Sequence, residues 1–129
     1  MAESSEFKEK RKIFSRVLKN YAAWKSLVES EGLFSITLRD GEEIHYMDIL
    51  DGFKVLPPRQ RQAVWLMCVE DLPEVEVAQM MGFKGWPTPV QQYKNIGLAR
   101  LIKYQEATVW EKFEMQRKAR RHNKVLVSA

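Results

Sequence analysis

Five residues whose side chains can form hydrogen bonds lie close together in the sequence of this 129-residue chain: Thr88, Gln91, Gln92, Lys94 and Asn95. Gln and Asn can form two hydrogen bonds at once with the edge of an adenine, and Lys can reach guanine or a phosphate. On one helix, these residue types could therefore read the bases of a DNA duplex. A solvated polar face is the alternative interpretation, because many helical proteins carry one.

The segments around these residues favour a helix-turn-helix. Apolar spacing, with glycine and proline at the breaks, predicts three helices, over residues 58–70, over 74–81 and from 88 onward. Gly82 is expected to end the second helix, and residues 83–87 to form the turn. Thr88 is the expected N-cap of the third helix, with Pro89 at its first position and Gln91 completing a capping box. In this layout the N-terminal residues of the third helix enter the major groove.

The N-terminal segment is expected to support that unit. Apolar residues at three- and four-residue spacing predict one amphipathic helix over residues 6–30. Ser5 is its expected N-cap and Gly32 its C-terminal stop. The basic cluster at residues 8–12 is interpreted as a solvated face of this helix.

Two short alternating segments flank Asp40-Gly41, a dipeptide typical of hairpin turns. They cover residues 33–39 and 42–46 and predict a small two-stranded hairpin, which must lie on a helix to be stable. One helical turn is expected over Met47–Phe53, ended by Gly52.

The third helix of the helix-turn-helix is expected to be long, running from residue 88 to about Arg121. A glycine inside a helix costs roughly 1 kcal/mol, so Gly97 indicates close packing against a neighbour. Trp110 and Phe113 are expected in the helical core, and an exposed aromatic anchor for a partner is the alternative.

Basic residues are concentrated in the last third of the chain. The 21 Lys and Arg exceed the 17 Asp and Glu, which gives a net charge of +4 and a pI near 9.2. Residues 1–87 carry 12 basic and 14 acidic side chains, whereas residues 88–129 carry 9 and 3. Such asymmetry is expected of a protein that meets phosphates, and a solvated basic tail explains it equally well.

Composition argues against several classes of protein. Cys68 is the single cysteine and is interpreted as a small core residue, and with only two histidines a zinc site is not expected. No cofactor, metal or enzymatic activity is expected, since the chain has neither a phosphate-binding glycine loop nor a nucleophile–base pair. No apolar run approaches the ~18 residues of a membrane span, and residues 1–6 are too polar for a signal peptide. We therefore expect a cytoplasmic protein without a membrane partner.

Three motifs occur in order along the chain: Leu56-Pro57-Pro58-Arg59-Gln60-Arg61-Gln62-Ala63-Val64, Ala78-Gln79-Met80-Met81-Gly82 and Gly97-Leu98-Ala99-Arg100-Leu101. Together they resemble region four of the sigma-factor family of bacterial RNA polymerase, over about residues 54–104. The resemblance implies a domain that binds promoter DNA and docks on the flap of the polymerase β subunit. Nothing in residues 1–53 resembles the sigma module that melts promoter DNA, so a complete sigma factor is not expected.

The resemblance also implies roles for individual residues. Gln91 and Gln92 match base-facing positions of the recognition helix. Thr88 and Asn95 are further candidates for base contacts. The positions that match residues near the phosphate backbone are Arg59, Arg61, Lys94 and Arg100. A phosphate close to the first two would relieve the unfavourable placement of cations at a helix N-terminus.

These observations predict a mainly α fold, a helix-turn-helix bundle with an N-terminal amphipathic helix, a small β-hairpin and a long basic C-terminal helix. The expected division is an N-terminal appendage at 1–53, the helix-turn-helix domain at 54–104, and a basic helix and tail at 105–129. The expected function is a sequence-specific transcription regulator with two partners, double-stranded DNA and bacterial RNA polymerase. One alternative is a polymerase-binding or sigma-blocking module with little DNA binding of its own, and another is a small-terminase-like packaging protein. A homodimer and a phage-infected host cell are left open.

Overall fold

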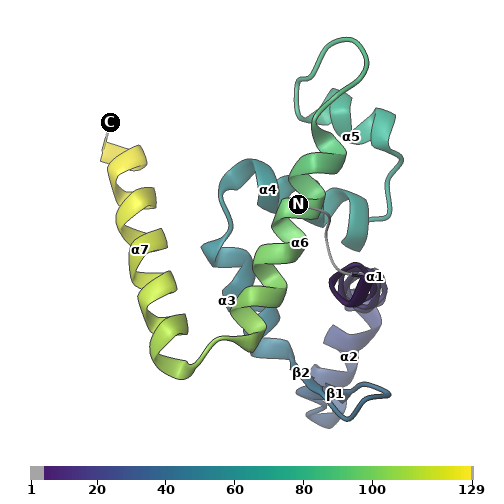
Figure 1. Cartoon of the computed structure of the whole chain (residues 1–129), viewed down its shortest axis with the longest axis vertical. Coiled ribbons are helices and arrows are strands. Elements are labelled where there is room, and N and C mark those ends of the chain that lie inside the picture. The colour runs from purple at the N-terminus through teal and green to yellow at the C-terminus, as the bar shows by residue number, and fades with distance from the viewer. Residues whose placement is uncertain (1–4, 129) are drawn as a thin grey trace.

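The computed structural model describes residues 5–128, with side chains through Arg121. Its helices, in chain order, are α1 (Ser5–Lys19), α2 (Tyr21–Glu31), α3 (Tyr46–Val55), α4 (Pro58–Val64), α5 (Glu74–Met80), α6 (Val90–Glu106) and α7 (Val109–Ser128). A π-helical stretch, η1 (Trp65–Val69), continues α4, and strands β1 (Ser35–Thr37) and β2 (Glu43–His45) form an antiparallel pair. The predicted mainly α fold with a small hairpin is confirmed. Figure 1 shows α6 at the centre, with α1 on one side, α3 and α4 on the other, and α7 at the edge of the molecule.

The prediction of a single helix over residues 6–30 is wrong, because the helix is interrupted at Asn20, between α1 and α2. At this break the Arg16 carbonyl oxygen accepts hydrogen bonds from both the backbone N–H (3.2 Å) and the side-chain amide (3.0 Å) of Asn20. The change of direction brings Trp24 into the core, where its indole N–H donates to the Leu33 carbonyl (2.8 Å). Ser5 is the first residue of α1 itself, whereas Gly32 ends α2 in the left-handed conformation as predicted.

The predicted hairpin is confirmed, with Ile36 paired to Ile44. Gly41 closes its loop at a φ of +86°, a conformation that glycine adopts without strain. The Asp40 carboxylate accepts the backbone N–H of Glu42 at 2.9 Å, which holds the turn. The buried side chain of Ile44 fixes the hairpin to the helices, as an isolated two-stranded ribbon requires.

Two other boundaries differ from the sequence predictions. The turn predicted to stop at Gly52 is instead α3, which runs on to Val55 with Gly52 buried inside it. A Cβ at Gly52 would lie 2.9 Å from Leu101 Cδ2, so this glycine permits close packing of α3 against α6 and does not end the helix. The prediction of one continuous helix as far as Arg121 is also wrong, because the chain turns at residues 107–108, between α6 and α7.

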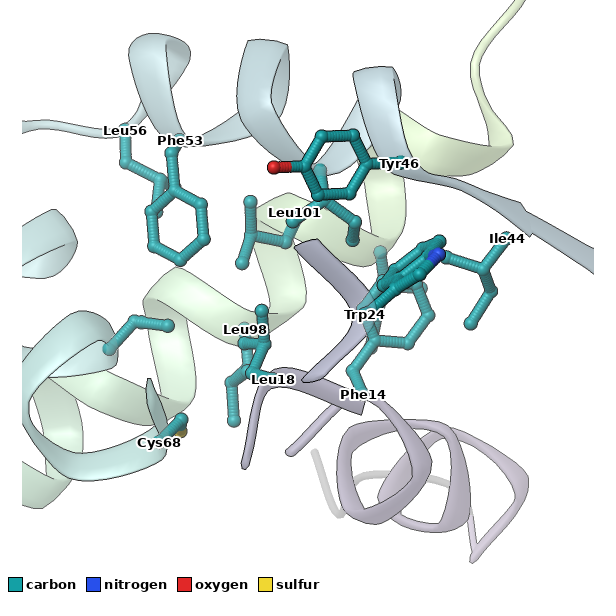
Figure 2. Packing of buried hydrophobic residues seen from close by; sticks show 13 residues of the cluster. Phe14, Leu18, Trp24, Ile44, Tyr46, Phe53, Leu56, Cys68, Leu98 and Leu101 are labelled. Atoms are coloured by element: carbon teal, nitrogen blue, oxygen red, sulfur yellow. The ribbon is translucent and has the colours of Figure 1, made fainter. Parts of the chain in front are cut away.

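One hydrophobic core joins the N-terminal helices to the rest of the chain. Figure 2 shows its side chains converging from α1, α2, α3 and α6, including Leu18, Trp24, Phe53, Leu98 and Leu101. All five are buried. The segment before residue 54 therefore packs directly on α6 and fixes its position.

Candidate nucleic-acid interface

The helix-turn-helix unit consists of α4 with η1, α5, a turn and α6. It has a small core of its own, formed by Ala63, Leu66, Val77, Ala78, Met81 and Val90. α5 ends at Gly82 (φ +82°), as predicted. The N–H of Gly82 donates to the Gln79 carbonyl, and that of Phe83 to the Ala78 carbonyl, which is the Schellman arrangement that closes a helix end. Local backbone signals thus fix the turn that leads to α6.

The start of α6 differs from the predicted capping box. The helix begins at Val90 with Pro89 at the N-cap position, and no side chain caps it. Thr88 lies just outside, and its hydroxyl is buried without a hydrogen-bond partner. The buried side chain of Val90 anchors this first turn to the small core, so packing, and not capping by Thr88, decides where α6 begins.

The first turns of α6 expose a polar face. Gln91 and Gln92 are exposed and Asn95 is half-buried. At 3.6 residues per turn, these three side chains lie within about 100° of the helix circumference. The opposite side of α6 is buried, with Val90 in the small core and Leu101 in the main core. The structure therefore presents these amides together, on a helix whose other face is held by packing.

Gly97 holds α6 close to α4, as the sequence predicted. A Cβ at this position would lie 2.5 Å from Val64 Cγ2 and 3.3 Å from the backbone oxygen of Gln60. Only glycine permits this separation, so the close packing at Gly97 fixes the distance between α6 and α4.

The basic candidates occupy different environments. The guanidinium of Arg59 lies 4.9 Å from the ring centroid of Phe83, and this ring stacks on Tyr93 of α6 (6.1 Å between centroids). Arg59 is exposed and stands beside the turn. Arg61 is half-buried, and its Nη2 donates to the carbonyl oxygens of Leu56 (3.0 Å) and Lys54 (3.4 Å). Arg61 thus ties the end of α3 to α4.

Lys94 and Arg100 line separate depressions on α6. Arg100 is exposed and borders a mostly apolar groove of about 410 Å³ that also contains Phe7 and Ile96. Lys94 and Asn95 line a groove of about 470 Å³ between α6 and α1. The structure therefore brings Lys94 next to the candidate base contacts and places Arg100 away from them.

The groove between α1 and α6 is strongly basic, and it was not predicted from the sequence. Its cationic side chains are Lys8, Arg11, Lys12, Arg16, Lys19 and Lys94. No acidic residue is among the described residues that line it. The four-residue spacing of Lys8, Lys12 and Arg16 was a visible signal of one basic face, but the packing of that face beside α6 was not visible.

The C-terminal helix α7 lies on the other side of α6 from α1 in Figure 1. It is attached to α3 by an ion pair between Lys112 and Asp48 (3.0 Å), and to α6 by a hydrogen bond from Gln116 to the Tyr104 hydroxyl. Trp110 and Phe113 were predicted to be buried but are 69% and 49% exposed, with stacked rings. The prediction failed because the turn at residues 107–108 points the start of α7 away from the core.

Cys68 is buried in the main core, as predicted, and burial raises the pKa of its thiol. Across residues 5–128 and their described side chains, no three metal-binding side chains come together. No helix in that part of the chain is both long and apolar enough to cross a lipid bilayer.

Comparison of the chain with protein-family models, with curated proteins and with solved structures finds no match.

Proposed function

We propose that this chain is a sequence-specific, double-stranded DNA-binding protein that regulates transcription through its helix-turn-helix. The observation that carries the proposal is the polar N-terminal face of α6, with Gln91 and Gln92 exposed and Asn95 beside them. In a helix-turn-helix, the N-terminal residues of the recognition helix, which is α6 in this chain, reach base edges in the major groove. Glutamine and asparagine amides donate and accept at once, as a specific contact with adenine requires.

The rigid support of α6 favours base reading. Hydrogen bonds to bases need side chains held in one register, and a mobile helix would lose that selectivity. Gly97 brings α6 against α4, and Val90 anchors its first turn in the small core. A helix that only needs a solvated surface has no requirement for such close support.

Arg59 gives this interface a candidate phosphate contact. Its guanidinium lies on the Phe83 ring, which fixes its direction and leaves its N–H groups available to an anion. Phosphate contacts set the position of a protein on the duplex, whereas base contacts give selectivity. Arg59 and the two glutamines thus supply different parts of one interface.

A second candidate function is a protein-interaction module that acts on bacterial RNA polymerase. The exposed pair Trp110 and Phe113 favours it, because aromatic side chains often form the centres of protein interfaces. The two functions are compatible, since the pair lies on α7 and the glutamines lie on α6.

The proposal is tested by selecting ligands from a random pool of DNA duplexes, with and without RNA polymerase, and then measuring affinities. Replacing Gln91 or Gln92 by alanine should weaken binding to the selected site by about 1–3 kcal/mol, because one bidentate base contact is lost. Binding to random duplex should change little. Gln62→Ala, which removes an exposed glutamine from α4, is the matched control and should leave both affinities unchanged.

Equal losses on selected and random DNA would show that these glutamines do not read bases. Recovery of a consensus site only when polymerase is present would favour the interaction module over independent DNA binding.

A further inference from the structure

The cations of α1 form one continuous face along the groove beside α6. Lys8, Lys12, Arg16 and Lys19 follow one another at intervals of three or four residues, so they fall on the same side of the helix. At a rise of 1.5 Å per residue they cover about 17 Å, with one positive charge for every turn. This length suits an extended anion and exceeds what a single small anion can contact.

Most of this charge has no internal counterpart. Within the described chain, Lys8, Lys12, Arg16 and Lys94 form no ion pair. Lys19 pairs with Asp71 at 3.4 Å, but both side chains are more than 60% exposed, so the pair contributes little. Lys10, on another side of α1, is paired with Glu106, and its pKa is raised by that contact. Lys8, Lys12, Arg16 and Lys94 therefore lie in one groove without a neutralising partner among the described residues, and their like charges repel one another.

The opposite wall of the groove belongs to α6. Lys94 and Asn95 line it one turn after Gln91, and the buried side chain of Leu98 forms part of its floor. A duplex whose bases meet Gln91 and Gln92 would thus bring its backbone next to this groove. The groove continues the proposed base-reading surface and shares Asn95 with it.

We infer that the groove between α1 and α6 binds the sugar-phosphate backbone of double-stranded DNA, with Lys8, Lys12, Arg16 and Lys94 as phosphate contacts. This inference rests on the proposed function and extends it, because it assigns a DNA contact to a helix outside the helix-turn-helix. A lipid surface fits less well, since the apolar residues Phe14 and Leu18 of α1 are buried in the core and cannot enter a bilayer.

The test compares variants that remove the same charge from different places. Lys12→Gln/Arg16→Gln neutralises the groove, and Lys25→Gln/Lys54→Gln removes two exposed cations of α2 and α3 outside it. Affinity for the selected duplex and for random duplex is measured from low to moderate salt. Each phosphate contact contributes about 0.9 to the slope of log affinity against log salt. The groove variant should therefore lower the slope by about 1.8 and weaken both duplexes by the same factor.

The control pair should leave the slope within error of wild type, and Lys12→Arg/Arg16→Lys should preserve it. Far-UV circular dichroism checks that each variant is folded. If the groove pair and the control pair give equal slopes while Gln91→Ala still loses selectivity, the inference fails and the proposed function stands. If wild type binds no duplex, both fail. Equal DNA affinities combined with loss of binding to anionic phosphatidylserine vesicles would overturn the inference in favour of a membrane.

Discussion

Gly97 is a position at which α6 packs tightly against α4. Its missing side chain leaves room for Val64 Cγ2 and for the Gln60 carbonyl oxygen. Since Gln91 and Gln92 lie about two turns earlier on the same helix, this one contact sets how far they project. The packing of Gly97 in the core thus affects the position of Gln91 and Gln92 in the candidate interface.

Gly97→Ala should lower the free energy of unfolding by about 1–3 kcal/mol, as overpacked cores do. The gain in helix propensity, roughly 1 kcal/mol, does not offset it, because one of the atoms too close to the new Cβ is backbone. Urea denaturation followed by tryptophan fluorescence measures the change.

Gly52→Ala is the matched control. The nearest atom to its new Cβ is Leu101 Cδ2, at the flexible end of a side chain, so the loss should be smaller. A Gly97→Ala protein as stable as the Gly52→Ala protein would contradict the close approach of α4 and α6.

At the scale of elements, the turn between α6 and α7 decides which surfaces are exposed. Thr108 and Glu111 form a capping box, in which the Glu111 N–H donates to Thr108 Oγ1 (3.2 Å) and the Thr108 N–H donates to Glu111 Oε1 (3.0 Å). The backbone hydrogen bond from Thr108 lowers the pKa of the Glu111 carboxyl. The box starts a new helix where the apolar pattern alone would have continued the old one.

Thr108→Ala should destabilise α7 by roughly 0.5–2 kcal/mol, because the first turn of the helix loses its side-chain acceptor. The measurement is helix content by far-UV circular dichroism, together with hydrogen exchange of the amides in α7. Thr108→Ser keeps the hydroxyl and should behave like wild type. Unchanged exchange in the alanine variant would mean that the cap does not support this helix.

At the scale of the whole molecule, an aromatic cluster joins the N-terminal helices to the helix-turn-helix. Tyr21 of α2 stacks on Tyr46 of α3 and meets the edge of Trp65 in η1. The hydroxyls of Tyr21 and Tyr46 are 3.1 Å apart. Burial, with the hydrogen bond to Tyr46, raises the pKa of Tyr21 to about 12. This cluster helps to hold α1 and α2, and with them the basic groove, against α6.

The raised pKa predicts a loss of stability in alkali. The folded protein holds the Tyr21 proton more tightly than the unfolded chain, in which the pKa is 10.0. The stabilisation is therefore complete below pH 10 and is lost as the pH rises towards about 12. The urea midpoint should fall over this interval, and it should fall less steeply in Tyr21→Phe. Parallel curves for the two proteins would contradict the assignment.

The features predicted correctly depend on neighbouring residues. The hairpin at Asp40-Gly41 and the end of α5 at Gly82 rest on the backbone freedom of glycine, and the close packing at Gly97 rests on its missing side chain. The breaks at Asn20 and Thr108 were missed because the apolar spacing continues across both, although the Thr108/Glu111 capping box was a local signal for the second break. Trp110 was misplaced for the same reason.

The sequence by itself determined the mainly α class, the order of the helix-turn-helix and the polar residue types on α6, since these follow from short-range periodicity and turn chemistry. The basic character of one face of α1 was also present in its spacing. Only the tertiary structure decided that this face lies beside Lys94 and Asn95, that Arg61 is used within the fold, and that α7 is attached to α3. The reason is physical: these arrangements come from burying Leu18, Trp24 and Leu98 in one shared core, and such long-range packing has no local signature.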